Sequence, residues 1–589
     1  MTFEPSTGNY EVQYIGFDDT VHITTLLPGN RAAPRVSATV TINSQNRFSY
    51  SYEVYNDSLA LAGLREFEVV VSESDSIAVP QQDGWSTIYT TSLGRQTWYQ
   101  SGDIGNELAP ASSLSGFGLI DSGIPSIVRG FGASLRYLAF DDEGPTGDLR
   151  RELDSLDLAT AEIALITIAP RDPPSPFDLG DFLDTLGTYP LRAAAEGWIA
   201  DSTAGELDRL LNDASSALSG GDSTWTATLL GTVLNHVEEI KDDSLTGEGY
   251  ALMKYNIEYA LGNLPGLVPI KVFLEGPYAS GQEIMLPTND STPLVQPFGD
   301  ESLPYNYGGT ESVTRFPNFV ADWIHVMLID VSGTWTVEYA RPALLSKTGF
   351  AYPAFPSSVS GDYLLAVAEY NHVYVASDTV VTISNGSAGH DFTHGAGYSD
   401  NNQPQRPLSG GVYVMWAGDG TQDGQVTALD FTLWLAASTA GATGYEPADY
   451  NRDQVVTGPD EDLWLANTTA GARAPHVLSD AIHAIPPLQS GPMTFGAGSP
   501  TSQLRLNVTR DDRNDFWVSV EARADTSLLP DNTVGSATID VNYDASKMAF
   551  QSSDTGVLAP QNGYRVTTVD VAESSQHFVR LSIDCSGIA

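Results

Sequence analysis

Acidic side chains recur at a fixed spacing in two short stretches of this sequence. The first stretch, DGTQDGQVTALD (residues 419–430), has Asp at its first, fifth and twelfth positions and Gly at its sixth. The second stretch, DYNRDQVVTGPD (residues 449–460), has Asp at the same three positions. Oxygen donors that recur in one register are the ligands that a hard cation requires. The repeat therefore predicts a pair of metal sites.

A twelve-residue loop can enclose one calcium ion with side chains at positions 1, 3, 5 and 12, a backbone carbonyl at position 7 and often a water at position 9. The first loop supplies these positions from Asp419, Thr421, Asp423, Gln425, Thr427 and Asp430. The second loop supplies them from Asp449, Asn451, Asp453, Val455, Thr457 and Asp460. We therefore expect two calcium ions. More backbone strain is expected in the second loop, because Gln454 stands where the first has Gly424.

Each loop leads into a short apolar segment of helical character, LDFTLWLAAS after the first and EDLWLANTT after the second. Trp434 and Trp464 occupy equivalent places and are expected to pack between the two halves. The order of loop, apolar residue at position 8 and helix resembles a type I dockerin, with Asp instead of Glu at position 12. Thr421 and Gln454 depart from that family's usual residues. The alternative is a pair of solvated acidic turns, but duplication in register favours metal.

The overall charge restricts the class of partner. The chain has 589 residues, with 74 Asp plus Glu against five Lys and 23 Arg, and a formal net charge of −46. Such a charge repels phosphate backbones and anionic lipid, so nucleic acid is not expected as a partner. Scarce Lys with abundant acid indicates a halophilic surface, since molar salt screens self-repulsion. The alternative is an ordinary acidic secreted protein.

Three further features bear on location. The single cysteine, Cys585, excludes an internal disulfide framework. No apolar run reaches the length of about 18 residues that a membrane helix needs, so no membrane span is expected. The first residues, MTFEPSTGNY, lack the basic and apolar regions of a signal peptide. A secreted or cell-surface location would then require a leader before this numbering or another export route.

The expected architecture is multidomain and mainly β, because a chain of this length exceeds the usual ~100–200 residues per domain. Alternating apolar residues in RFSYSYEVY, with REFEVVV and EIALITI, predict a β-sandwich over 1–168. Four prolines in APRDPPSPFD mark a boundary. Apolar residues at helical spacing then predict a small helical bundle over 178–263. Alternation returns in VPIKVFLEG, DWIHVMLIDV and DYLLAVAEY, which predicts a second, Ig-like sandwich over 264–400.

The remaining chain comprises the dockerin-like calcium-binding module, 411–473, a linker, and a third sandwich over 501–589. KVFLEGPY, DWIHVMLIDV, GDYLLAVAEYNHVYVAS and GVYVMWAGD are similar to segments of secreted multidomain surface proteins of marine and salt-loving bacteria. That resemblance spans about 178–475 and implies a location more than a reaction. VNYDASKMAF is similar to the opening strands of a cohesin-like domain. This domain is expected to be incomplete on its convincing strands alone, which leaves three alternatives: further strands lie within 551–575, the sequence is truncated, or a neighbouring chain supplies the missing strand.

A search for catalytic residues finds no G-x-S-x-G, H-E-x-x-H, G-x-G-x-x-G or P-loop motif. His390 and His394 have a zinc-like spacing only on a helix, and the glycines beside them favour a loop. His325 and His372 lie on expected strands beside aromatic residues and are interpreted as structural rather than as general bases. Aromatic residues that could stack on sugars are interpreted instead as sandwich core: Trp85, Trp98 and Tyr99.

The leading hypothesis is a non-enzymatic extracellular protein, structural or adhesive, that forms part of a surface or a filament. Its partners would be other proteins, including copies of itself by strand exchange. The alternatives are a glycan-binding or polysaccharide-degrading component with dockerin-type docking, and a virion spike of a halophile virus. Removal of calcium is expected to unfold the module over 411–473 and to leave the sandwiches intact.

The acidic composition makes a testable prediction about salt. We expect the midpoint of thermal unfolding to rise as KCl increases from 0.1 to 3 M, because salt screens the repulsion between surface carboxylates. Circular dichroism at a series of KCl concentrations measures the midpoint. A flat or falling curve would contradict the halophilic interpretation.

Overall fold

The computed structural model describes most of the chain and shows a multidomain mixed protein, mostly β-sheet with a helical segment. Two compact units are present, the first of Met1–Asn43 with Arg47–Pro492 and the second of Ser44–Asn46 with Met493–Ala589. The ranges described with side chains are 1–71, 84–100, 107–140, 144–299, 307–331, 335–384, 388–399 and 403–475. Backbone alone is described for 77–79, 503–510, 516–523, 537–543, 565–573 and 576–584.

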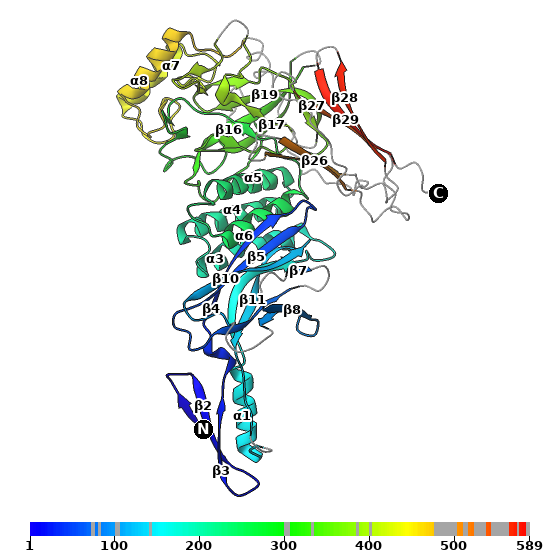
Figure 1. The fold of residues 1–589 in the computed structure, drawn as a ribbon. Coiled ribbons are helices and arrows are strands. Elements are labelled where there is room, and N and C mark those ends of the chain that lie inside the picture. Colours follow the sequence, from blue (N-terminus) through cyan, green and yellow to red (C-terminus); the bar gives the residue numbers. More distant parts are fainter. Residues whose placement is uncertain are drawn as a thin grey trace. The chain divides into compact units, whose positions relative to one another are not determined.

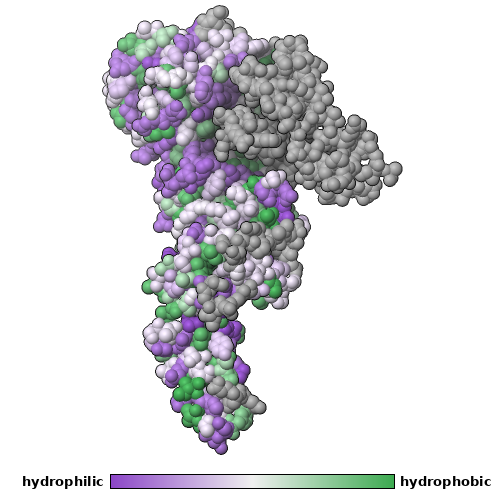
Figure 2. Space-filling model, in the orientation of Figure 1, coloured by the Kyte–Doolittle hydropathy of each residue, from purple (hydrophilic) through white to green (hydrophobic). Residues whose placement is uncertain are grey.

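The N-terminal residues form a three-stranded antiparallel sheet that packs on one helix. The sheet order is β1 (Thr2–Glu4), β2 (Asn9–Ile15) and β3 (Val21–Leu26), and the helix is α1 (Gly147–Ala159). Val12, Leu26 and Leu153 make the core between them. The expectation of β structure throughout 1–168 missed α1, because this charged helix buries only one residue. Apolar side chains on the outer side of β2 and β3 remain exposed at this end of the molecule (Figure 2): Ile15, Val21 and Ile23.

Two antiparallel sheets, here called the first sheet region, pack face to face beyond this element (Figure 1). One sheet has the order β4 (Pro34–Ile42), β5 (Phe48–Asn56), β10 (Ser112–Asp121), β7 (Ile77–Val79). The other has the order β12 (Ile163–Arg171), β11 (Ile124–Ser134), β6 (Leu64–Val70), β9 (Arg95–Gln100), β8 (Trp85–Thr90). Tyr52 lies 5.7 Å from Phe67 and 5.9 Å from Trp98 between ring centroids, which places aromatic rings of both sheets in one core.

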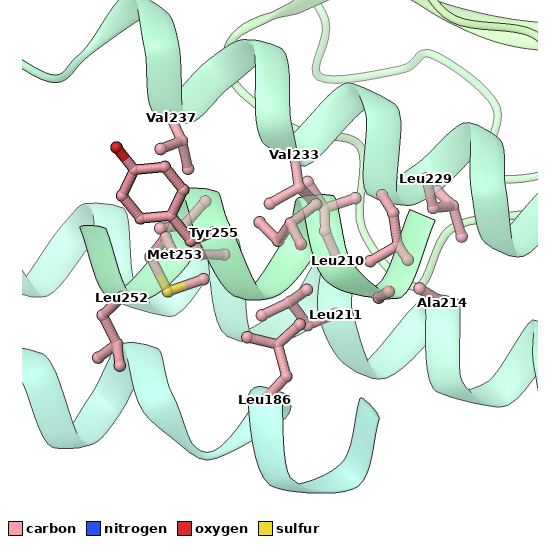
Figure 3. Close-up of a cluster of buried hydrophobic side chains, with 14 of the residues drawn as sticks. Leu186, Leu210, Leu211, Ala214, Leu229, Val233, Val237, Leu252, Met253 and Tyr255 are labelled. Carbon is pink, nitrogen blue, oxygen red and sulfur yellow. The ribbon is translucent and has the colours of Figure 1, made fainter. Parts of the chain in front are cut away.

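A helical bundle follows, as the spacing of apolar residues predicted. Its helices are α2 (Leu179–Gly187), α3 (Tyr189–Ala195), α4 (Asp201–Ser219), α5 (Ser223–Glu239) and α6 (Gly247–Leu261). Asp178, Asp222 and Thr246 cap α2, α5 and α6 by accepting backbone N–H groups. The predicted apolar faces are buried together (Figure 3): Leu210, Leu211, Ala214, Leu229, Val233, Val237 and Met253.

The bundle and the first sheet region share one hydrophobic core. The hydroxyl of Tyr255 donates to the Val40 carbonyl at 3.2 Å, and Nδ2 of Asn256 donates to the Pro125 carbonyl at 2.8 Å. The buried Glu248 accepts the backbone N–H of Ala38. The element type therefore changes near the proline-rich stretch, but packing is continuous across it.

The second sheet region is built around one five-stranded sheet. Its strands are β17 (Val337–Ser346), β16 (Val320–Asp330), β19 (Ser360–Glu369) and β20 (His372–Ala376) in that order, with β21 (Val381–Ser384) also paired to β19. A smaller sheet has the order β18 (Phe350–Ala351), β13 (Ile270–Lys271), β22 (His390–Asp391). Two hairpins add β14 (Tyr278–Ala279) with β15 (Ile284–Met285), and β23 (Arg406–Pro407) with β24 (Tyr413–Val414). Trp225 of α5 stacks on Trp323 of β16, with 5.6 Å between centroids.

The C-terminal unit contains five described strands in two sheets. One sheet pairs β25 (Gln503–Arg510) with β26 (Phe516–Arg523). The other has the order β27 (Ala537–Tyr543), β29 (Gln576–Asp584), β28 (Arg565–Glu573). Strand β28 lies in the stretch 551–575, where the sequence left open whether strands occur. Cys585 lies outside the described residues.

Within the described ranges, no helix is both long enough and apolar enough to cross a bilayer.

Candidate metal centre

The two acidic loops end in two helices that begin in the same way. Helix α7 spans Ala428–Ala440 and helix α8 spans Gly458–Ala470. The N–H of Thr427 donates to Oδ2 of Asp430 at 2.7 Å, and the N–H of Thr457 donates to Oδ2 of Asp460 at 2.8 Å. Positions 9 and 12 of each loop thus close a capping box, which predisposes the chain to turn from loop into helix there.

The first loop is organised around the carboxylates of Asp419 and Asp430. Asp419 accepts the N–H of Asp423 at 3.1 Å and that of Gly424 at 2.9 Å. Oδ1 of Asp430 accepts the N–H and the hydroxyl of Thr421, at 2.9 and 2.8 Å. Both ends of the loop are therefore tied to backbone groups between them.

The second loop repeats the backbone N–H bonds position by position, whereas the side chain at position 3 differs, since Nδ2 of Asn451 donates to Asp453. Asp449 accepts the N–H of Asp453 at 3.1 Å and that of Gln454 at 2.8 Å. Oδ1 of Asp460 accepts the N–H of Asn451 at 3.0 Å. The sequence repeat is therefore also a structural repeat.

The remaining predicted positions also correspond between the loops. The position-5 carboxylates accept the position-7 N–H at 3.0 Å in each loop: Asp423 from Gln425, and Asp453 from Val455. The backbone at position 7 forms isolated β-bridges, Gln425 with Arg473 and Val455 with Thr443. Both loops are thus closed by the chain that follows a helix.

The predicted backbone strain in the second loop is confirmed. Gly424 has φ +82°, and Gln454 at the same place has φ +72°. A side chain disfavours this left-handed conformation by roughly 1 kcal/mol relative to glycine. The first loop also has no room for a side chain, since a Cβ on Gly424 would lie 2.5 Å from Oη of Tyr374.

Burial and repulsion by neighbouring carboxylates penalise the charged forms of Asp419, Asp449 and Asp460. Asp419, Asp430, Asp449 and Asp460 are at most 1 % exposed. Burial raises the pKa of Asp419 well above its ordinary value, and the charges of Asp430 and Asp423 raise it further. Burial is also the main cause that raises the pKa of Asp449 to about 7 and that of Asp460 above its ordinary value. A cation between such carboxylates would remove much of this cost.

The residues fit calcium by their donor chemistry. Among the described residues, no three His, Cys, Asp or Glu side chains are grouped as a metal site by themselves. Ion binding would therefore have to draw the three aspartates of a loop together, with the oxygens of Thr421 or Asn451 and the carbonyls at position 7 completing an all-oxygen set of the kind that calcium takes. Each carboxylate oxygen of Asp419 and Asp449 accepts one N–H and retains a second lone pair for this purpose. Both oxygens of Asp430 also accept a threonine hydroxyl, so the hydroxyls of Thr421 and Thr427 would have to rotate away for Asp430 to bind an ion.

The sequence did not indicate the role of position 4. Gln422 has φ +58° and Arg452 has φ +60°, and both side chains are buried, with 1 % and 4 % exposure. Arg452 forms an ion pair with the fully buried Asp322 of β16. Its guanidinium lies 4.1 Å from the ring centroid of Tyr445. A buried Arg beside two candidate ligands is a signal for a buried carboxylate partner, but spacing alone cannot identify that partner.

The histidines considered as catalytic groups have structural surroundings. His325 is fully buried and stacks on Phe298, and burial lowers its pKa to about 3. Nδ1 of His372 lies 2.6 Å from Oε2 of Glu369, with both side chains buried. His390 lies in β22 and His394 in a short 3-10 helix (Phe392–His394), not on one α-helix.

The aromatic residues considered for sugar stacking separate into two groups. Trp98 is 1 % exposed and stacks on Phe67 at 5.4 Å between centroids. Trp85 contacts Phe117 edge-on at 5.1 Å. Trp98 therefore belongs to the core, as predicted, and the partly buried Trp85 packs against that core. The same prediction is wrong for Tyr99, which is 36 % exposed.

Comparison with known proteins gives no family for this chain. No protein-family model matches it, and no curated protein is significantly similar to it.

The difference at position 6 of the loops yields a matched pair of variants. We expect Gln454→Gly to raise the unfolding free energy by roughly 0.5–1 kcal/mol, because glycine adopts the left-handed conformation without strain. Gly424→Ala should lower it by more than that, because a Cβ there also meets the Tyr374 ring. Urea denaturation of the full chain measures both. Stabilisation by Gly424→Ala, or clear destabilisation by Gln454→Gly, would contradict this account of the loops.

Proposed function

We propose that this chain is an extracellular structural or adhesive protein in which two calcium ions stabilise the loop–helix pair, residues 411–473. The observation that supports this proposal is the duplicated loop, with four buried aspartates in one hydrogen-bonding pattern. An acidic turn that only faced solvent would have no reason to bury these carboxylates. The dockerin-like identity of the pair is part of the proposal.

In this proposal each acidic loop binds one calcium ion. Asp419, Asp423 and Asp430 hold the first ion with Thr421 and the Gln425 carbonyl, with Thr427 at position 9. The second ion is held by the equivalent set Asp449, Asn451, Asp453, Val455, Thr457 and Asp460. Bound calcium would supply a positive charge that offsets the repulsion between these carboxylates. At a concentration one hundred times the Kd, each independent site would add about 2.7 kcal/mol to the free energy of unfolding.

The architecture supports a structural role rather than a catalytic one. The face-to-face sheets fit Ig-like sandwiches, and the C-terminal strands fit a cohesin-like domain, both as proposals. The acidic surface fits a protein that works in salt outside the cell. The chain contains several β-sheets, and the edge strand of a sheet can pair with a strand of another chain. We therefore propose protein partners, including copies of the same chain.

The glycan-binding alternative has less support. A sugar platform needs exposed aromatic faces, and Trp85 and Trp98 are instead packed against Phe117 and Phe67. Tyr99 keeps an exposed ring, but a single tyrosine on a sheet is common on protein surfaces.

Calorimetric titration of the chelator-treated full chain with calcium chloride tests the ion sites. We expect two ions per chain for the wild type and one for Asp423→Ala, because the variant removes the ligand oxygens at position 5 of the first loop. Asp462→Ala, on the exposed side of α8, is the matched control and should still bind two. Absence of binding heat in the wild type, or two ions in Asp423→Ala, would reject the proposed sites.

Electron microscopy with calcium and with chelator tests the structural role. We expect ordered assemblies or filaments at high concentration, and no release of reducing ends from a polysaccharide panel. A chain that remains monomeric and cleaves or tightly binds one polysaccharide would instead support the glycan alternative.

A further inference from the structure

The turn between β19 and β20 lies against both acidic loops. Its residue Asn371 is fully buried. The main-chain carbonyl of Asn371 accepts the N–H of Gly418 and that of Asp419, both at 3.1 Å. Its Nδ2 donates to the main-chain carbonyl of Asp449 at 2.7 Å. One residue of the second sheet region therefore holds position 1 of both loops.

The turn itself is held by a buried carboxylate. Oε2 of Glu369 accepts the N–H of Asn371 at 3.0 Å and lies 2.6 Å from Nδ1 of His372. Glu369 and His372 are both fully buried. These bonds fix the orientation of Asn371, since its backbone cannot rotate without breaking the hydrogen bond to the buried Glu369 side chain.

The second loop has a further anchor in the same sheet. Arg452 stands between the candidate ligands Asn451 and Asp453, and its side chain pairs with Asp322 of β16. The Arg452 carbonyl accepts the N–H of Thr288 at 2.9 Å. The hydroxyl of Tyr445 donates to Oδ1 of Asp322 at 3.1 Å. Moving this loop away from the sheet would leave a buried Asp and a buried Arg without their partners, which is strongly unfavourable.

The start of the first loop and helix α8 are joined to the sheet region by a second carboxylate. Oε2 of Glu275 accepts the N–H of Ala417 at 3.0 Å and Nδ2 of Asn467 at 2.6 Å. Arg406 pairs with the same Glu275. The segment 415–417 also forms single β-bridges, Leu274 with Met415 and His372 with Ala417. Both the start of the first loop and helix α8 are therefore hydrogen-bonded to the second sheet region.

We infer that Asn371 is a positioning residue for both calcium sites, and that through it ion binding in either loop stabilises the second sheet region as well as the loops. This inference rests on the proposed calcium binding. It replaces the expectation, drawn from the sequence, that chelation would unfold 411–473 and leave the sheets intact. The two position-1 aspartates share one anchor, so displacing it disturbs both sites together.

Hydrogen exchange of the full wild-type chain, with calcium chloride and with EGTA, tests the coupling without any variant. We expect EGTA to speed amide exchange in β16, β19 and β20 together with α7 and α8. If two ions bind by titration but the change is confined to residues 411–473, the coupling is wrong and the proposed sites stand. If no ion binds, the proposed function fails, and the inference with it.

Two variants separate positioning from ordinary stability. Asn371→Ala removes the Nδ2 bond to Asp449 and should weaken calcium binding at the second site by roughly tenfold or more, as loss of a group that orients a ligand does. The first site should be affected less, because the main-chain carbonyl of residue 371 that holds Gly418 and Asp419 remains. It should therefore reduce the rise in melting temperature that calcium produces. Val375→Ala removes fully buried methyl groups of β20 and should lower the melting temperature equally with and without calcium. An unchanged calcium increment in Asn371→Ala would overturn the inference.

Discussion

The buried ion pair between Arg452 and Asp322 is the interaction on which the arrangement of the second half of the first unit depends. Each partner is less than 5 % exposed, and each would be costly to leave without the other in the interior. Because Arg452 belongs to an acidic loop and Asp322 to the central strand β16, the pair prevents the loop from separating from the sheet. The loop–helix pair is consequently a part of the sheet region rather than a freely tethered module.

The acidic loops themselves are built by local bonds. Their aspartates accept backbone N–H groups within the same twelve residues, and each loop ends in a capping box. Such bonds depend on few distant residues, which explains why the two loops have the same pattern. The surroundings differ, since position 4 is a neutral Gln422 in one and a charged Arg452 in the other. The two loops therefore share the same local hydrogen bonds but pack on the rest of the protein through different long-range contacts.

The distribution of charge follows one physical rule in two environments. The chain has a net charge of −46, and its exposed carboxylates are favoured by water and salt. Other buried carboxylates have specific partners: Glu248 has the N–H of Ala38 and the hydroxyl of Thr246, Glu275 has Arg406, and Asp322 has Arg452. Asp419 has backbone donors but no cation within the described contacts, and its neighbours are acidic. This contrast is the physical basis for the proposed ions.

The sequence alone determined the elements whose signal is periodic. Alternation predicted β5, β16 and β19, and helical spacing predicted α4, α5 and α6, because burial of one face imposes those periods. The loop repeat and the turn at Gly424 could also be predicted from the sequence, since their hydrogen bonds are local. Only the tertiary structure revealed α1, the shared core of bundle and sheets, and the contacts of Asn371 and Arg452. Residues such as Asn371 and Asp449 lie far apart in the chain, and no spacing rule specifies which buried polar groups will meet once the sheets have packed.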